Sequence, residues 1–110
     1  MTLIRQFINA MQSCDAHALG SLFAPDGVYH DFCPQDAGRA KYYAYGTEGI
    51  DMFFRNRFVF QHFRISSPVI VSDTQAYYFA VYGNFHLQAI ATIQEFDADG
   101  NIRSLVVRPA

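Results

Sequence analysis

Asp31 is the residue whose type and position most clearly suggest chemistry. It lies in a short segment from Val28 to Cys33 that follows the helix breaker Pro25. Strand alternation would point Tyr29, Asp31 and Cys33 to one side. Because aspartate is depleted in strands, we interpret Asp31 as a candidate general base in an apolar pocket, where burial raises a carboxyl pKa. The alternative is a carboxylate at the pocket mouth, held by backbone N–H groups or an arginine.

His62 is the second candidate catalytic residue. It shares one face of the segment after the third expected helix with Phe60 and Arg64. If that face is concave, His62 could approach Asp31 and form a proton-transfer pair. If it is convex, His62 is an interface residue, as we also expect for His86 near a hairpin end. The four histidines show no paired spacing typical of metal sites, so neither a metal nor an organic cofactor is expected.

The composition indicates one domain spanning residues 1–110. Charged residues make up only 16% and the net charge is −2, which argues against a nucleic-acid partner. Neither a signal peptide nor a membrane-spanning stretch is evident, and Cys14 and Cys33 form no disulfide framework, so we expect a cytoplasmic protein. Eleven Phe and seven Tyr indicate a large aromatic core, a lined cavity or a buried oligomer face.

Hydrophobic periodicity predicts two helices, an irregular excursion, a third helix and then strands. Thr2, Asp15 and Thr47 are suitable N-caps for the helices. Gly83-Asn84 is a two-residue hairpin signal, and Pro68 marks a bulge or an edge. The helical patterns, the loop and the strands cover residues 3–11, 16–23, 34–45 (loop), 47–58, 60–71 (irregular strand), 75–82, 85–96 and 102–108.

This order predicts an α+β fold in which a curved, mostly antiparallel sheet wraps around three N-terminal helices as a cone-shaped barrel. A pocket would lie between the helices and the sheet. The other sheet face would need a cover, and a homodimer through this convex face is the simple solution. We place Tyr78, Ala80 and Tyr82 on it.

Several motifs resemble the nuclear transport factor 2-like superfamily, which includes ketosteroid isomerase and the SnoaL-like polyketide cyclases. They are residues 22–26 running into the strand with Asp31, residues 46–50 opening the third helix, and the closing hairpin of residues 93–107. The resemblance implies a cystatin-like topology and matches Asp31 to the isomerase's general base. The isomerase's two oxyanion-hole donors fall at Phe7 and Gln94, so ketosteroid isomerisation itself is not expected.

The resemblance also implies which residues line the pocket. Tyr77, Phe79 and Val81 correspond to the pocket side of their strand. The full set of expected ligand-binding residues is Phe7, Tyr29, Phe53, Tyr77, Phe79, Gln94, Leu105 and Val107.

Three functions remain open for this sequence. The first is an isomerase, dehydratase or cyclase that acts on a small apolar or aromatic molecule with Asp31 as base. The second is a non-catalytic binding module for a metabolite or a protein, and the third is a domain whose task is oligomerisation. An ion pair between Asp31 and an arginine such as Arg39 or Arg64 would argue against catalysis. A free, buried Asp31 facing a cavity of a few hundred Å³ would favour it.

Overall fold

The computed structural model describes all residues, 1–110, as three α-helices and one six-stranded sheet. The helices are α1 (Leu3–Gln12), α2 (Ala16–Ser21) and α3 (Thr47–Phe60), with a short 3₁₀ helix η1 (Cys33–Ala37). The strands are β1 (Phe23–Asp31), β2 (Tyr42–Tyr45), β3 (Arg64–Ile70), β4 (Gln75–Tyr82), β5 (Phe85–Phe96) and β6 (Ile102–Pro109). The predicted α+β class and cone architecture are confirmed.

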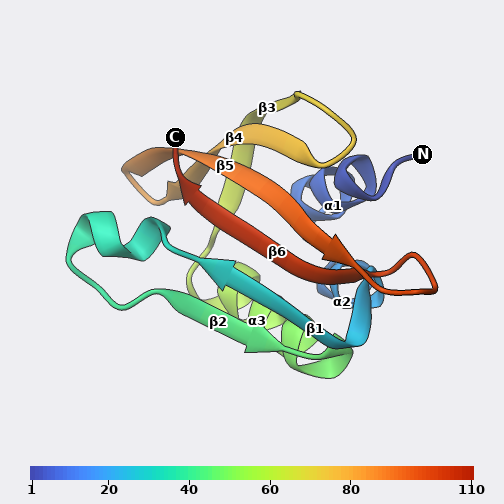
Figure 1. Cartoon of the computed structure of the whole chain (residues 1–110). Helices are drawn as coiled ribbons and strands as arrows, with labels where there is room; N and C mark the ends of the chain where they lie inside the picture. The colour runs from blue at the N-terminus through green and yellow to red at the C-terminus, as the bar shows by residue number, and fades with distance from the viewer.

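The sheet is open, curved and mixed, with strand order β2-β1-β6-β5-β4-β3. Only β1 and β6 pair in parallel, and every other neighbouring pair is antiparallel. Pairing the first strand with the last places the end of β1 beside β6, at the centre of the sheet. Figure 1 shows the sheet crossing the molecule, with α2 and α3 behind it.

The helices begin where the sequence supplies caps. The Thr2 side chain accepts a hydrogen bond from the Arg5 N–H, and the Asp15 side chain accepts one from the Ala18 N–H. The prediction of Thr47 as an N-cap was wrong by one residue, because helix α3 already begins at Thr47 and Gly46 occupies the N-cap position. The helices cover one face of the sheet, and none is long and apolar enough to cross a membrane.

Strand β1 is longer than the alternation pattern predicted. It begins at Phe23 and runs through Asp26 and Gly27, with a register shift against β6 between Phe23 and Val28. A Cβ at Gly27 would lie only 2.8 Å from the Ile102 carbonyl oxygen, so glycine allows β6 to approach closely. Beyond this irregularity Tyr29 and Asp31 point into the core, as predicted.

Strand β4 faces opposite to the prediction. Ala76, Tyr78 and Ala80 are buried beneath the helices, with Tyr78 only 1% exposed, whereas Phe79 is 37% exposed. Placing Tyr77 and Phe79 on the pocket side was therefore wrong, as was placing Tyr78, Ala80 and Tyr82 on the convex face. Strand alternation has a period of two, so an error of one residue exchanges the two faces completely.

Two local irregularities were predicted from single residues. The β3–β4 register shifts between Ser66 and Val69, next to Pro68, which confirms the bulge. Gly83 has a φ of 57° in the two-residue loop that pairs Tyr82 with Phe85, which confirms the hairpin. The expected loop of residues 34–45 also contains structure, namely η1 and β2.

Candidate functional site

Asp31 lies at the end of β1 and is only 1% exposed. Its Oδ2 accepts hydrogen bonds from the Tyr29 hydroxyl at 3.0 Å and from Arg57 Nη2 at 2.9 Å. Its Oδ1 accepts one from the Cys33 backbone N–H at 2.9 Å. The ion-pair partner of Asp31 is therefore Arg57 rather than Arg39 or Arg64. By the criterion set from the sequence, this ion pair argues against Asp31 as a free general base.

Arg57 comes from the core-facing stripe of α3 and is also 1% exposed. Besides Asp31, its guanidinium donates to the Tyr29 hydroxyl at 3.0 Å and to the Tyr82 hydroxyl. We call Tyr29, Asp31, Arg57 and Tyr82 the Arg57 cluster. The guanidinium also lies 3.7 Å from the centroid of the Phe63 ring, so the cation is enclosed by oxygens and aromatic carbon.

The electrostatics of this cluster favour one fixed protonation pattern. Burial alone lowers the pKa of Arg57, but the oxygens of Tyr29, Asp31 and Tyr82 outweigh burial and raise it well above its ordinary value. Burial, and then the Asp31 charge, raise the pKa values of both the Tyr29 hydroxyl and the Cys33 thiol. The Cys33 sulfur is therefore a protonated thiol at neutral pH and a poor nucleophile.

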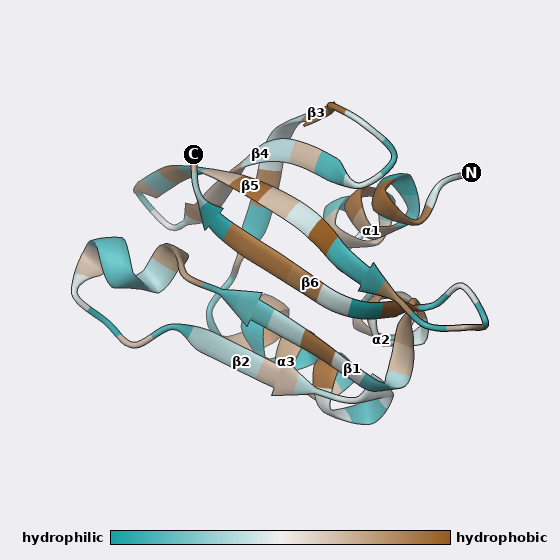
Figure 2. Ribbon diagram, viewed as in Figure 1, coloured by the Kyte–Doolittle hydropathy of each residue, from teal (hydrophilic) through white to brown (hydrophobic).

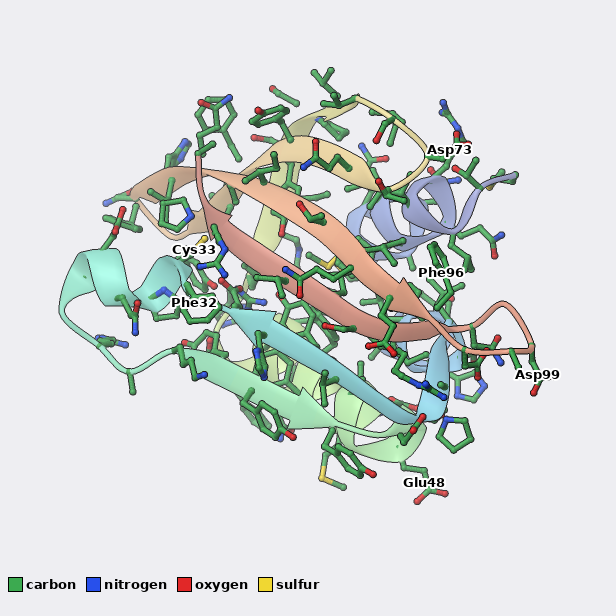
Figure 3. All side chains as sticks on the ribbon, in the orientation of Figure 1. Phe32, Cys33, Glu48, Asp73, Phe96 and Asp99 are labelled. Carbon is green, nitrogen blue, oxygen red and sulfur yellow. The ribbon has the colours of Figure 1, made fainter.

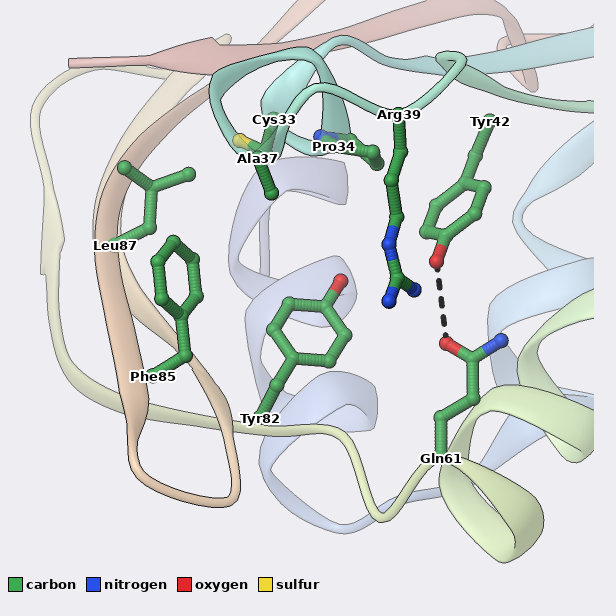
Figure 4. Close-up of a pocket in the computed structure, with 9 residues that line it drawn as sticks. All are labelled: Cys33, Pro34, Ala37, Arg39, Tyr42, Gln61, Tyr82, Phe85 and Leu87. Carbon is green, nitrogen blue, oxygen red and sulfur yellow. Dashed lines mark hydrogen bonds between the residues drawn. The ribbon is translucent and has the colours of Figure 1, made fainter.

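A pocket of about 560 Å³ opens beside the Arg57 cluster rather than over Asp31. Figure 4 shows its walls, which come from η1, the loop to β2, the end of α3 and the β4–β5 hairpin. Its lining residues are Cys33, Pro34, Ala37, Arg39, Tyr42, Gln61, Tyr82, Phe85 and Leu87. None of the ligand-binding residues expected from the sequence lines this pocket.

The pocket lies at one end of the sheet, next to the point where β1 ends. Figure 3 shows Cys33 at this end and Asp99, in the β5–β6 turn, at the other. A left-handed residue, Gly38, ends η1 with a φ of 72° and returns the chain toward β2. The 3₁₀ helix thus forms a rim over the pocket.

Tyr82 connects the Arg57 cluster to the pocket. Its hydroxyl accepts a hydrogen bond from Arg57 Nη2, and its ring lines the pocket wall. Burial raises the pKa of Tyr82 to about 12, so the hydroxyl keeps its proton at neutral pH. Because the lone pair is engaged by Arg57, the O–H is available to donate to a ligand oxygen.

His62 and Gln94 lie away from Asp31. His62 is exposed, with a φ of 53°, in the link between α3 and β3, so the expectation that it occupies a strand face is wrong. Gln94 is exposed where β5 shifts register against β6, and it contacts Ser104. Neither position can be read from alternation, because the backbone leaves the regular strand geometry at both.

The other expected ligand-binding residues lie in the core or on the opposite face. Phe7, Leu105 and Val107 are fully buried core residues. Phe53 packs beside Tyr29, with ring centroids 5.6 Å apart, so the structure does bring these two together around Arg57. No three His, Cys, Asp or Glu side chains are grouped so as to hold a metal ion.

Arg57 is the residue that sequence reasoning missed. Its signal is present, since Ile50, Phe54 and Arg57 follow one another at spacings of four and three on one helix face. An arginine within such a stripe is exceptional and requires a buried anion as a partner. Searching for this pair would have connected α3 with Asp31.

The fold and the position of the pocket define a cone-shaped α+β domain with an opening at one end. The SnoaL-like domain model matches residues 4–105, and the chain therefore belongs to this family. No curated protein matches it.

Solved structures of the same architecture come from several bacteria. A protein of unknown function with a cystatin-like fold from Methylobium petroleophilum has a TM-score of 0.70 at 21% identity, over 98% of this chain and 73% of that one. A protein from Sphaerobacter thermophilus has a TM-score of 0.69 at 18% identity, over 98% of this chain and 93% of that one. A protein with a ketosteroid isomerase-like fold from Catenulispora acidiphila, in complex with trimethylamine, has a TM-score of 0.63 at 20% identity, over 98% of this chain and 85% of that one. At these identities the likeness establishes the fold.

Proposed function

We propose that this protein binds a small, largely apolar or aromatic molecule in the pocket between η1 and the β4–β5 hairpin. The observation that carries the proposal is the pocket itself, about 560 Å³ in volume and walled mainly by Pro34, Ala37, Phe85 and Leu87. This volume lies within the range of small-molecule sites, which are mostly apolar with a few placed polar groups. Tyr82 supplies one such group.

A variant that fills the pocket tests this function. Ala37→Phe adds an aromatic ring at the rim without adding charge, and Ala98→Phe makes the same change in the exposed β5–β6 turn. We expect aromatic compounds to shift the NMR signals of pocket residues in the wild type and in the Ala98→Phe variant. Ala37→Phe should abolish these shifts. Shifts that persist in Ala37→Phe would place binding elsewhere.

Catalysis as an isomerase, dehydratase or cyclase is the second candidate. What supports it is the link from Asp31 through Arg57 to the Tyr82 hydroxyl, which faces the pocket. Asp31 does not itself line the pocket, so in such an enzyme Tyr82 would meet the substrate oxygen and Asp31 would position Arg57. The binding function requires none of these steps, and we therefore place it first.

Tyr82→Phe separates the two candidates because it removes the hydroxyl but leaves the Asp31–Arg57 pair intact. Small ketones and polyketide-like compounds are suitable substrates for the assay. Turnover by the wild type that falls in Tyr82→Phe while binding persists would support an enzyme. If the wild type turns over none of these substrates, the result supports a non-catalytic binding module.

We also propose a homodimer through the convex sheet face. Consecutive cross-strand partners Tyr43, His30, Val106 and Thr92 form one row of this face. A second row runs through Val69, Tyr77 and Ile90. Figure 2 shows the mixed hydropathy of the strands that form this surface. Its aromatic and aliphatic side chains suit burial against a second copy.

A further inference from the structure

We propose that the ligand of the pocket carries an anionic group, of carboxylate type, that Arg39 binds. This inference rests on the proposed binding function and names the chemical class of its ligand, an apolar or aromatic monocarboxylate. It is carried by the side chain of Arg39, which lines the pocket and is not part of any of the five ion pairs of the protein.

The backbone around Arg39 is held in place by η1. The Gly38 N–H donates to the Gln35 carbonyl, and the Arg39 N–H donates to the Pro34 carbonyl at 3.1 Å. Gly38 is left-handed, a conformation that suits glycine. As Figure 4 shows, this turn directs the Arg39 side chain toward the pocket, where it lies between Tyr42 and Tyr82 and remains exposed to solvent.

The charge of the lining has one sign. Arg39 is the only charged residue among the nine that line the pocket. The nearby Asp31 is paired with Arg57, so it does not neutralise Arg39. An anion is therefore the ligand charge that this pocket favours, because a guanidinium beside low-dielectric walls attracts it more strongly than in bulk water.

The donors of the pocket match a carboxylate. Arg39 presents a planar set of N–H groups, and the Tyr82 hydroxyl has its proton free because it accepts from Arg57. Two donors on neighbouring walls can engage the two oxygens of one carboxylate. A single arginine among mostly apolar side chains suits one carboxylate on an apolar body better than a polyphosphate, which requires several cations.

The test compares three compounds with the same ring system and different charge. Naphthylacetate is anionic, naphthylacetamide is neutral and naphthylethylamine is cationic at neutral pH. Isothermal titration calorimetry would measure their affinities for the wild type, for Arg39→Gln and for Arg5→Gln. Arg5 is exposed on α1 and, like Arg39, belongs to no ion pair, so it is a matched control.

We expect the wild type to bind naphthylacetate about tenfold or more tightly than naphthylacetamide, the scale of a hydrogen bond to a charged group. Arg39→Gln should remove this preference while leaving the affinity for the amide nearly unchanged, and Arg5→Gln should retain it. Added salt should weaken the binding of naphthylacetate alone. Because Arg39 is exposed, its variant is expected to fold, which thermal unfolding would verify.

Failure of this inference differs from failure of the binding function. Equal affinities for naphthylacetate and naphthylacetamide, or a preference for naphthylethylamine, would overturn the proposal of an anionic ligand. The pocket would still be a binding site. A preference for the acetate that survives in Arg39→Gln would also overturn it. If none of the three compounds binds the wild type, both proposals fail.

Discussion

Arg57 and Asp31 illustrate why a buried charged residue is better understood as one half of a pair. Removing two charges from water costs several kcal/mol per ion, which only good geometry and further hydrogen bonds repay. Here Tyr29, Tyr82 and the Cys33 N–H supply those bonds. The pair joins α3 to the end of β1, so we infer that its role is to fix the wall of the pocket.

A double-mutant cycle should reveal this coupling. Arg57→Met and Asp31→Asn each leave one buried polar partner without its counterpart, and we expect each to cost about 3–5 kcal/mol of unfolding free energy. The double variant should cost clearly less than the sum of the two, because it leaves no uncompensated charge. Urea denaturation would measure all four proteins. Simple additivity would show that the two residues act independently.

Alkaline pH should destabilise the protein through its buried tyrosines. Burial raises the pKa values of Tyr29, Tyr78 and Tyr82, that of Tyr82 to about 12, whereas an unfolded tyrosine ionises near pH 10. Between about pH 10 and about pH 12 the unfolded chain has released protons that the folded protein keeps, so stability falls as pH rises. The stability that these three buried tyrosines contribute should be fully present below about pH 10. Urea midpoints against pH would measure this fall, and Tyr82→Phe should make it shallower.

At the scale of elements, alternation located β4 but not its buried face. Both faces of this strand are apolar, with Tyr77, Phe79 and Val81 on one and Ala76, Tyr78 and Ala80 on the other. The face with alanines is buried because small side chains leave room for the helices, and Tyr78 opposes Ala89 on β5. Hydrophobicity alone therefore does not distinguish the two faces, and the face that the family resemblance implied was the wrong one.

The helices and hairpins were predictable because each rests on local signals such as caps, Pro68 and Gly83-Asn84. The pocket was not predictable in the same way. Its walls come from η1, the end of α3 and the β4–β5 hairpin, which only tertiary packing brings together. Asp31 was identified correctly as a buried polar residue, but its partner Arg57 is 26 residues away.

Alanine substitutions at adjacent positions of β4 check the assignment of its faces. Tyr78→Ala removes a fully buried ring and should cost about 3–5 kcal/mol, as large-to-small core changes do. Phe79→Ala alters a partly exposed side chain on the other face and should cost about 1 kcal/mol or less. Both are measured by denaturation at high dilution, where self-association does not contribute. A larger cost for Phe79→Ala than for Tyr78→Ala would indicate instead that Phe79 lies on the pocket side of β4.

At the scale of the whole molecule, the sheet has one covered face and one that the helices leave open. The pocket and the Arg57 cluster use the covered side, whereas the convex side carries side chains such as Val69, Tyr77 and Ile90. The expected dimer face thus keeps its place in the fold but changes its residues on β4. A dimer through it would leave the pocket rim of η1 and the hairpin free to admit a ligand.

Ile90→Lys tests the convex-face dimer directly. Ile90 is half-buried on β5, between Tyr77 of β4 and Arg108 of β6, so a lysine there would bring an unpaired charge into the interface. We expect light scattering at micromolar concentration to give twice the chain mass for the wild type and a monomer for Ile90→Lys. Met52→Lys makes the same kind of change on the exposed side of α3 and should remain dimeric. A wild type that is monomeric under these conditions would rule out the dimer, and a dimeric Ile90→Lys would place its interface elsewhere.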